Sequence, residues 1–154
     1  MKYLLRTCVC MMMFLLTACT ENHSFSLDEK RQIIVIHNLL HLRIESESSK
    51  SGEHQVFRVL KRKHDTKDIY ILRLHDISPE LSVSKTNEHG IYKEIQIIDL
   101  LPNRRYTIIH SGMGGRVRIQ EYFRTDSIGN LRVDPTRKRK VGWREVLGTD
   151  SWGT

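Results

Sequence analysis

The most informative part of this 154-residue chain for its architecture is Leu100-Leu101-Pro102-Asn103-Arg104-Arg105-Tyr106-Thr107-Ile108-Ile109-His110. Pro102 fixes its own φ and cannot donate to a strand ladder, so it indicates a turn. Residues 106–110 are rich in β-branched and aromatic side chains, which favour a strand. The stretch therefore predicts a turn that leads directly into a strand.

Further strand candidates flank this stretch on both sides. They are short and separated by clusters of turn-forming residues, such as Ser127-Ile128-Gly129-Asn130. Short strands at this spacing are typical of an all-β sandwich or barrel. The candidates are residues 32–36, 40–44, 55–60, 69–74, 81–83, 91–98, 106–110, 116–123 and 131–133.

Residues 32–44 leave an alternative open. Leu40, Leu42 and Ile44 alternate with polar residues, as in a half-buried strand, and His37-Asn38 suits a tight turn. Ile33, Ile36, Leu40 and Ile44 also fall near the helical period of 3.6 residues. The β-branched content favours two strands over one helix.

Leu100, Pro102 and Tyr106 resemble the Leu-x-Pro-x-x-x-Tyr stretch of fibronectin-III-like sandwiches. In that family the tyrosine hydroxyl returns to upstream backbone and forms a tyrosine corner. The resemblance implies an immunoglobulin/fibronectin-III-like β-sandwich of about seven to eight strands. The alternative is a proline turn followed by an unrelated strand tyrosine.

The N-terminus has the pattern of a secretory signal peptide. Lys2 and Arg6 precede an apolar run over residues 8–16, which is too short to span a bilayer. The following residues, Leu16-Thr17-Ala18-Cys19, resemble the lipobox of bacterial lipoproteins. The resemblance implies cleavage before Cys19 and acylation of its thiol with chains such as palmitate; the alternative is an ordinary signal peptide with an incidental Cys19.

This reading divides the chain into four parts: a signal peptide over 1–18, a lipidated tether over 19–30, a β-sandwich over 31–134 and a basic tail over 135–154. Cys8 and Cys10 leave with the signal, so no free thiol or disulfide is expected in the mature chain. In enterobacterial lipoproteins, an Asp directly after the acylated cysteine resembles a signal for retention in the inner membrane. This chain has Thr20 at that position. The resemblance thus implies the periplasmic face of the outer membrane.

The predicted tail carries much of the positive charge. The whole chain has a net charge of +7; without residues 1–18 the charge is +5, of which residues 135–154 contribute +3. A basic run of this kind can bind an acidic protein or anionic lipid, and secretion argues against nucleic acid. The alternative is a solvated tail. The candidate partner-binding residues are Arg137, Lys138, Arg139, Lys140, Trp143 and Arg144.

The sequence offers no catalytic or metal-binding constellation. His37 and His41 would share a face only on a helix, and no His-Glu-x-x-His motif occurs. Ser111 lacks the Gly-x-Ser-x-Gly context of a nucleophile. Gly112-Met113-Gly114-Gly115 precedes a strand candidate, so a hairpin turn is favoured over a phosphate loop. We expect no enzyme activity, no metal, no cofactor and no small-molecule substrate.

The layout resembles type VI secretion immunity lipoproteins of the bacterial periplasm. These begin with a lipobox and continue with a short hairpin, a Leu-x-Pro-x-x-x-Tyr stretch and an aromatic strand that leads into a Gly-turn hairpin. The matching segments here are 32–44, 100–106 and 122–133, while the cysteine-free body and the basic tail depart from the pattern. The resemblance implies a protein that binds and blocks a periplasmic toxin. The alternative is a structural or accessory lipoprotein of an envelope or secretion assembly.

Overall fold

The computed structural model describes residues 24–47, 54–63, 66–86, 90–111, 117–144 and 150–152, with the backbone alone described at 117, 142–144 and 150–152. The described part of the chain contains no helix and is all-β. The twelve strands of this part are β1 Phe25–Asp28, β2 Ile33–His37, β3 His41–Ser46, β4 Val56–Lys61, β5 Ile69–Arg73, β6 Leu81–Thr86, β7 Tyr92–Ile95, β8 Arg105–Ser111, β9 Val117–Thr125, β10 Leu131–Val133, β11 Lys140–Arg144 and β12 Asp150–Trp152.

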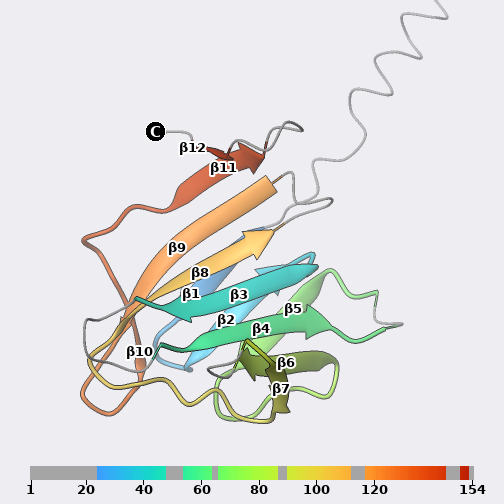
Figure 1. Cartoon of the computed structure of the whole chain (residues 1–154), viewed down its shortest axis with the longest axis horizontal. Helices are drawn as coiled ribbons and strands as arrows, with labels where there is room; N and C mark the ends of the chain where they lie inside the picture. The colour runs from blue at the N-terminus through green and yellow to red at the C-terminus, as the bar shows by residue number, and fades with distance from the viewer. Residues whose placement is uncertain are drawn as a thin grey trace, which may run out of the picture.

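The strands form two antiparallel sheets arranged as a sandwich. The smaller sheet has the order β1-β2-β5, and the larger has the order β12-β11-β9-β8-β3-β4-β6-β7, with β10 also paired to β9. In Figure 1 the larger sheet lies in front of β1, β2 and β5. The all-β sandwich predicted from the sequence is therefore confirmed.

The central strands follow the immunoglobulin-type order. The first, second and fifth strands share one sheet, while β3, β8 and β9 lie side by side in the other, as strands A, B, E and C, F, G do in that architecture. The described strands outnumber the expected seven to eight because β6–β7 and β10–β12 extend the larger sheet at its two edges. The sequence pattern predicts many of the strands but not these additional pairings.

The core lies between the two sheets and is built from the inward-facing residues of each strand. On β8, Tyr106, Ile108 and His110 are buried, whereas the residues between them face outward. The Tyr106 and Phe123 rings stack with centroids 5.0 Å apart across the β8–β9 pair. Complete burial of side chains of this size stabilises the fold by roughly 1.5–3 kcal/mol each.

Residues 32–44 form two strands and no helix, but these strands do not form a hairpin. The first, β2, pairs with β1 and β5, whereas β3 pairs with β4 and β8 in the other sheet. Asn38, with a φ of 49°, lies where the chain crosses between the sheets. The expected tight turn is therefore a sheet-to-sheet crossing.

The expected tether over 19–30 is shorter in the structure. Residues 25–28 form β1, which pairs with β2, and Phe25 is a core residue at 2% exposure. An isolated four-residue segment has too little periodicity to be recognised as a strand, so the sequence does not reveal its pairing with β2. Cys19 and the predicted signal peptide lie outside the described residues.

The expected tail over 135–154 is not separate from the sheet. Lys140–Arg144 form β11, which pairs with β9, and β12 pairs with β11. Both β10 and β11 lie along β9, so residues 134–139 leave the sheet and return to it. Three of the six candidate residues, Arg137, Lys138 and Arg139, thus lie in this excursion from the sheet (Figure 1), and the other three belong to β11.

Leu100, Pro102 and Tyr106 adopt the tyrosine-corner arrangement that the motif predicts. The buried Tyr106 hydroxyl accepts a 2.8 Å hydrogen bond from the backbone N–H of Leu101 and donates to Gln55 Oε1 at 2.7 Å. The motif thereby joins the connection before β8 to the segment that precedes β4. Leu100 is buried and Pro102 is exposed at the turn.

Candidate functional site

The larger sheet has an outer face that points away from β1, β2 and β5. We define the outer face by the residues that alternate with the buried ones on its central strands. No described element lies over these strands in Figure 1. The charged residues of the outer face are Arg43 and Glu45 on β3, Arg58 on β4, Arg105 on β8, Arg118 and Arg124 on β9, and, on the two edge strands, Lys140 on β11 and Glu94 on β7; Glu94 is ion-paired with Arg62. Cations therefore predominate.

Two arginines lie directly opposite each other at the centre of this face. The register of β3 and β4 pairs Arg43 with Arg58. Both Nε atoms are shielded from solvent and have no hydrogen-bond partner among the described residues. Like charges in opposed positions of a sheet repel each other. We call Arg43 and Arg58 the arginine pair.

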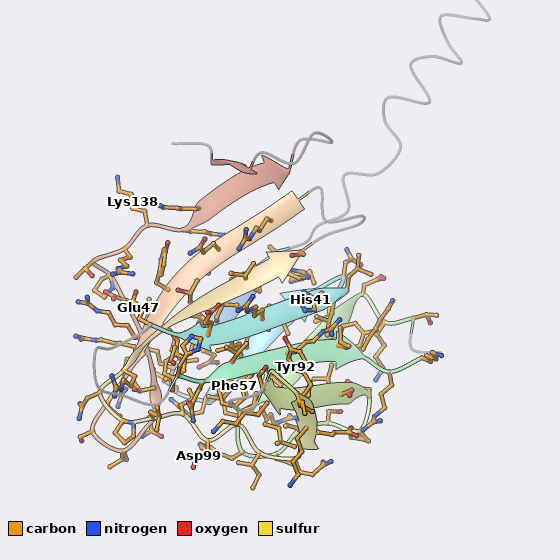
Figure 2. The ribbon with its side chains drawn as sticks, viewed as in Figure 1. His41, Glu47, Phe57, Tyr92, Asp99 and Lys138 are labelled. Atoms are coloured by element: carbon orange, nitrogen blue, oxygen red, sulfur yellow. The ribbon has the colours of Figure 1, made fainter. Side chains whose placement is uncertain are left out.

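The groups around the arginine pair neutralise it incompletely. Arg43 forms an ion pair with Glu45 at 2.9 Å, and the same carboxylate also contacts His54 at 3.1 Å. The Arg58 guanidinium lies 5.6 Å from the centre of the Tyr92 ring. Figure 2 shows Tyr92 and His41 on this side of the larger sheet. The Tyr92 ring and the Glu45 carboxylate, which also contacts His54, thus border the arginine pair.

Both burial and the neighbouring arginines affect the ionisation of His41. The pKa of the His41 imidazole is lowered because burial disfavours its charged form, and because the nearby guanidiniums of Arg58 and Arg43 add repulsion. Its cross-strand neighbour on β8 is the uncharged Ser111. The imidazole is therefore held in its neutral form at pH values where an ordinary histidine begins to charge.

A second row of arginines has its own internal acids. Arg105 on β8 pairs with Arg124 on β9, and Arg124 pairs with Arg132 on β10. Arg105 contacts the buried carboxylate of Asp134 at 3.6 Å. Arg132 contacts Asp126 at 3.1 Å and Glu29 at 3.8 Å. This row is consequently better neutralised than the arginine pair.

Hydrogen bonds from Thr136 favour the ionised form of the Asp134 carboxyl. Its Oδ1 accepts hydrogen bonds from the Thr136 hydroxyl at 2.5 Å and the Thr136 backbone N–H at 3.0 Å. These bonds lower the pKa of the Asp134 carboxyl, overcoming partial burial, and Arg105 and Arg124 lower it further. Asp134 thus provides a fixed negative charge at the end of the second row.

The residues of the predicted basic run have different environments. Arg137 forms an ion pair with Glu47, and its guanidinium lies 5.0 Å from the Tyr122 ring centre. Lys138 is exposed and projects outward in Figure 2. The Arg139 guanidinium lies 5.4 Å from the ring centre of Phe25, at the core edge. Arg137 and Arg139 therefore already have contacts within the domain.

The remaining candidates of this run belong to β11. Lys140 is exposed and pairs with Gln120 on β9, so it lies on the outer face. Trp143 and Arg144 continue the same strand, and their side chains lie outside the described part of the structure. The predicted run thus contributes Lys138 and Lys140 as exposed cations beside the outer face.

Glu121 occupies an unfavourable position on the inward side of β9. It pairs with the buried Ile108, and its Oε2 is shielded from solvent without a hydrogen-bond partner among the described residues. Burial raises the pKa of the Glu121 carboxyl, and the Arg139 charge partly opposes this effect. Arg139 therefore balances Glu121 at the core edge and is less available to a partner.

The histidines do not assemble into a metal site in the described ranges. Nothing there brings together three or more potential His, Cys, Asp or Glu ligands. His37 and His41 lie on strands of different sheets, and the core residue His110 makes an edge contact with Phe25 at 6.4 Å between ring centroids. His64, Asp65 and residues 112–116 lie outside the described ranges.

The arginine pair is the feature that the sequence did not identify. Arg43 and Arg58 both stand at polar positions of alternating strands, which is a usable signal. Their opposition requires the β3–β4 pairing and its register, and neither is readable from one alternation pattern.

Comparison with protein-family models, curated protein sequences and solved structures gives no significant match. Within the described residues, no helix has the length and apolar character needed to cross a membrane.

Proposed function

We propose that this protein is a non-catalytic lipoprotein of the bacterial cell envelope that binds an acidic protein partner. The observation that carries the proposal is the arginine-rich outer face, over which no described element lies. A face of one charge sign attracts a partner of the opposite sign and accelerates its association. The exposed Lys138 and Lys140 extend the same potential.

The proposed location depends on the N-terminal sequence. Leu16-Thr17-Ala18-Cys19 supports acylation of Cys19, and Thr20 supports the periplasmic face of the outer membrane. Several acyl chains give a firm anchor, because each buried methylene contributes about 0.8 kcal/mol. The anchored protein would accordingly bind its partner at the membrane surface.

The partner that best fits this arrangement is a periplasmic toxin with an acidic cleft, which the protein would block as an immunity protein. The resemblance to type VI secretion immunity lipoproteins supports this identification through the overall layout of the chain. A broad cationic face suits the covering of a cleft lined with carboxylates. No chemistry by this chain is needed for inhibition.

One observation favours a second candidate, an accessory lipoprotein of an envelope or secretion assembly. Strand β7 (Tyr92–Ile95) ends one side of the described larger sheet. It begins with the exposed Tyr92, and the exposed Ile91 and Ile97 lie before and after it. An open strand edge can accept a strand from a partner. The sheet edge, and not the cationic face, would then form the interface.

The decisive experiment takes the reading frames next to the gene for this protein and expresses each product in the periplasm, with and without the full-length protein, to find a toxin that it blocks. We expect survival and co-purification with the protein present. Arg118→Glu combined with Lys140→Glu should abolish both, because these changes invert the charge of the outer face. Arg73→Glu combined with Lys30→Glu makes the same change in net charge away from this face and serves as the control.

Equal killing with and without the protein would contradict the immunity function. Equal loss of co-purification in both double variants would contradict the outer face as the binding surface. Capture of a secretion component that survives the Arg118 and Lys140 changes, but is lost when β7 is altered, would favour the second candidate.

A further inference from the structure

The arginine pair has a cost that its surroundings do not offset. Arg43 and Arg58 are directly opposed on β3 and β4, and opposed like charges destabilise a sheet. Each guanidinium also keeps an Nε–H that is shielded from water and has no acceptor among the described residues. A sheet selected for stability alone would place an acceptor or an uncharged residue here.

The second row of arginines differs from the arginine pair because acidic residues of the same chain neutralise it. Arg105, Arg124 and Arg132 are attended by Asp134, Asp126 and Glu29. The arginine pair has Glu45, whose carboxylate is shared with His54. The missing negative charge at the centre of the outer face therefore points to an acceptor from another molecule.

The shape of this centre fits a protein carboxylate. Guanidinium groups bind carboxylates through paired N–H donors in one plane, which an ammonium group cannot do. Tyr92 holds Arg58 from one side, and Glu45 holds Arg43 from the other. Beyond β4, the outward positions of β6 carry small polar side chains, Ser82, Ser84 and Thr86, which allow close approach.

We propose that Arg43 and Arg58 form the recognition centre of the outer face and receive an Asp or Glu carboxylate of the partner protein. This inference rests on the proposed function, because it names the part of the outer face that the acidic partner contacts. A protein is favoured over a membrane because the pair lies in the middle of a sheet face, bordered on β6 by the small polar side chains of Ser82, Ser84 and Thr86.

The test uses the purified full-length protein in neutral detergent and labelled poly-L-glutamate as the probe, with binding followed by fluorescence anisotropy at low salt. Arg43→Gln combined with Arg58→Gln should weaken binding at least about tenfold, because charge-assisted bonds are lost. Arg31→Gln combined with Arg73→Gln removes the same charge from other exposed positions and should change binding less than about twofold, as exposed and distant charges do.

Two further measurements keep the test independent of folding. Arg43→Lys combined with Arg58→Lys keeps both charges but removes the planar donors, and we expect an intermediate loss of binding. Urea unfolding of the glutamine double variant should show a free energy of unfolding equal to or above that of the parent, because repulsion is removed. A lower value would show that the arginines serve the fold, and the inference would be abandoned.

Vesicles of phosphatidylcholine with one quarter phosphatidylglycerol form the second arm. If the glutamine double variant loses vesicle binding but keeps polyglutamate binding, the ligand is a membrane and the inference is wrong. Equal losses in the two double glutamine variants would likewise overturn it. If the arginine pair has no effect while the neighbouring-frame toxin is still captured, the proposed function stands and this inference alone fails.

Discussion

Tyr106 joins two distant parts of the chain through one hydroxyl group. The hydroxyl accepts from Leu101 and donates to Gln55, and all of these contacts are at least half-buried. We predict that Tyr106→Phe lowers the free energy of unfolding by about 2 kcal/mol, because a backbone donor and an amide oxygen lose their partner without access to water. Urea denaturation measures the change.

Tyr122 provides the control for this prediction on the adjacent strand. Its hydroxyl accepts from Gln120 at 2.9 Å on the half-buried outer face, where water can replace the lost bond. Tyr122→Phe should therefore cost less than about 0.5 kcal/mol. Equal costs for the two substitutions would contradict a structural role for the tyrosine corner.

His41 connects the electrostatics of the arginine pair with stability. Its pKa is lower in the folded state than the usual value of 6.5, first because of burial and then because of Arg58 and Arg43. The unfolded chain therefore binds more protons as the pH falls through 6.5, and stability decreases with acidification in this window. Above it, both states carry a neutral imidazole and the contribution is fully present.

We predict that Arg58→Gln raises the pKa of His41 towards 6.5 without reaching it, since burial remains. An NMR titration of the imidazole C–H signal measures this shift, with His41→Gln identifying the signal. Arg31→Gln, which removes a charge from the β1–β2 connection, should leave the signal's titration unchanged. An unaltered titration in Arg58→Gln would show that the Arg58 charge does not contribute to the lowered pKa of His41.

At the scale of elements, the β9–β10 turn depends on the absence of a side chain at Gly129. This residue has a φ of 89°, and an added Cβ would lie 2.7 Å from the Leu100 carbonyl oxygen. Asp126 shapes the same turn by accepting from the backbone N–H groups of Ile128 and Asn130. The turn thus lies directly against Leu100 of the tyrosine corner.

We predict that Gly129→Ala lowers the free energy of unfolding by about 2–3 kcal/mol, because backbone strain and a close contact are combined. Gly90→Ala is the matched control: its φ is 75°, but an added Cβ would meet nothing within 4 Å, so about 1 kcal/mol is expected. Thermal unfolding of both variants measures the difference. A loss no greater at Gly129 would contradict the importance of the Leu100 contact.

An element can be predicted from the sequence when it is determined by residues that are close together in the chain. Alternation in residues 105–111 and the turn at 126–130 are local features, and the structure has a strand and a turn at these places. The sheet crossing at Asn38 and the pairing of β11 with β9 depend on the distant partner that each strand finds. Sequence patterns specify the period of a strand but not its neighbour.

The same reasoning explains the candidate site. Clustered charges at 137–140 are visible in the sequence, but Arg137 and Arg139 make contacts with Glu47 and Phe25, which lie far away in the chain. The arginine pair is invisible until β3 and β4 are placed in register. A site assembled from single outward residues of several strands has no contiguous motif to detect.

At the scale of the whole molecule, the start of β1 restricts where the domain can lie if Cys19 is acylated. Phe25 is six residues after Cys19, and an extended chain spans at most about 3.6 Å per residue, so β1 begins within about 22 Å of the anchor. Ser24 accepts a backbone hydrogen bond from His37, which in turn pairs with Ile69 on β5. This end of the smaller sheet, including Ile69, should therefore face the membrane.

Two exposed isoleucines test this orientation in the acylated protein. Ile69 lies at the end next to Ser24, and Ile128 lies in the β9–β10 turn. Since no cysteine follows Cys19 in the sequence, Ile69→Cys and Ile128→Cys each introduce a single site for a polarity-sensitive fluorophore. In vesicles that contain a quencher-labelled lipid, we expect strong quenching at position 69 and little at position 128. Position 128 follows the far end of β9, and the nine residues of this strand span about 30 Å.

The measurement separates the anchor from the orientation. Acyl labelling that is lost in Cys19→Ala establishes the anchor, and unchanged labelling would refute it whatever the fluorophores report. With the anchor established, equal quenching at both positions would contradict the short connection as the determinant of orientation. Quenching confined to position 69 would leave the outer face, which runs along the strands and not across their ends, open to a partner approaching parallel to the membrane.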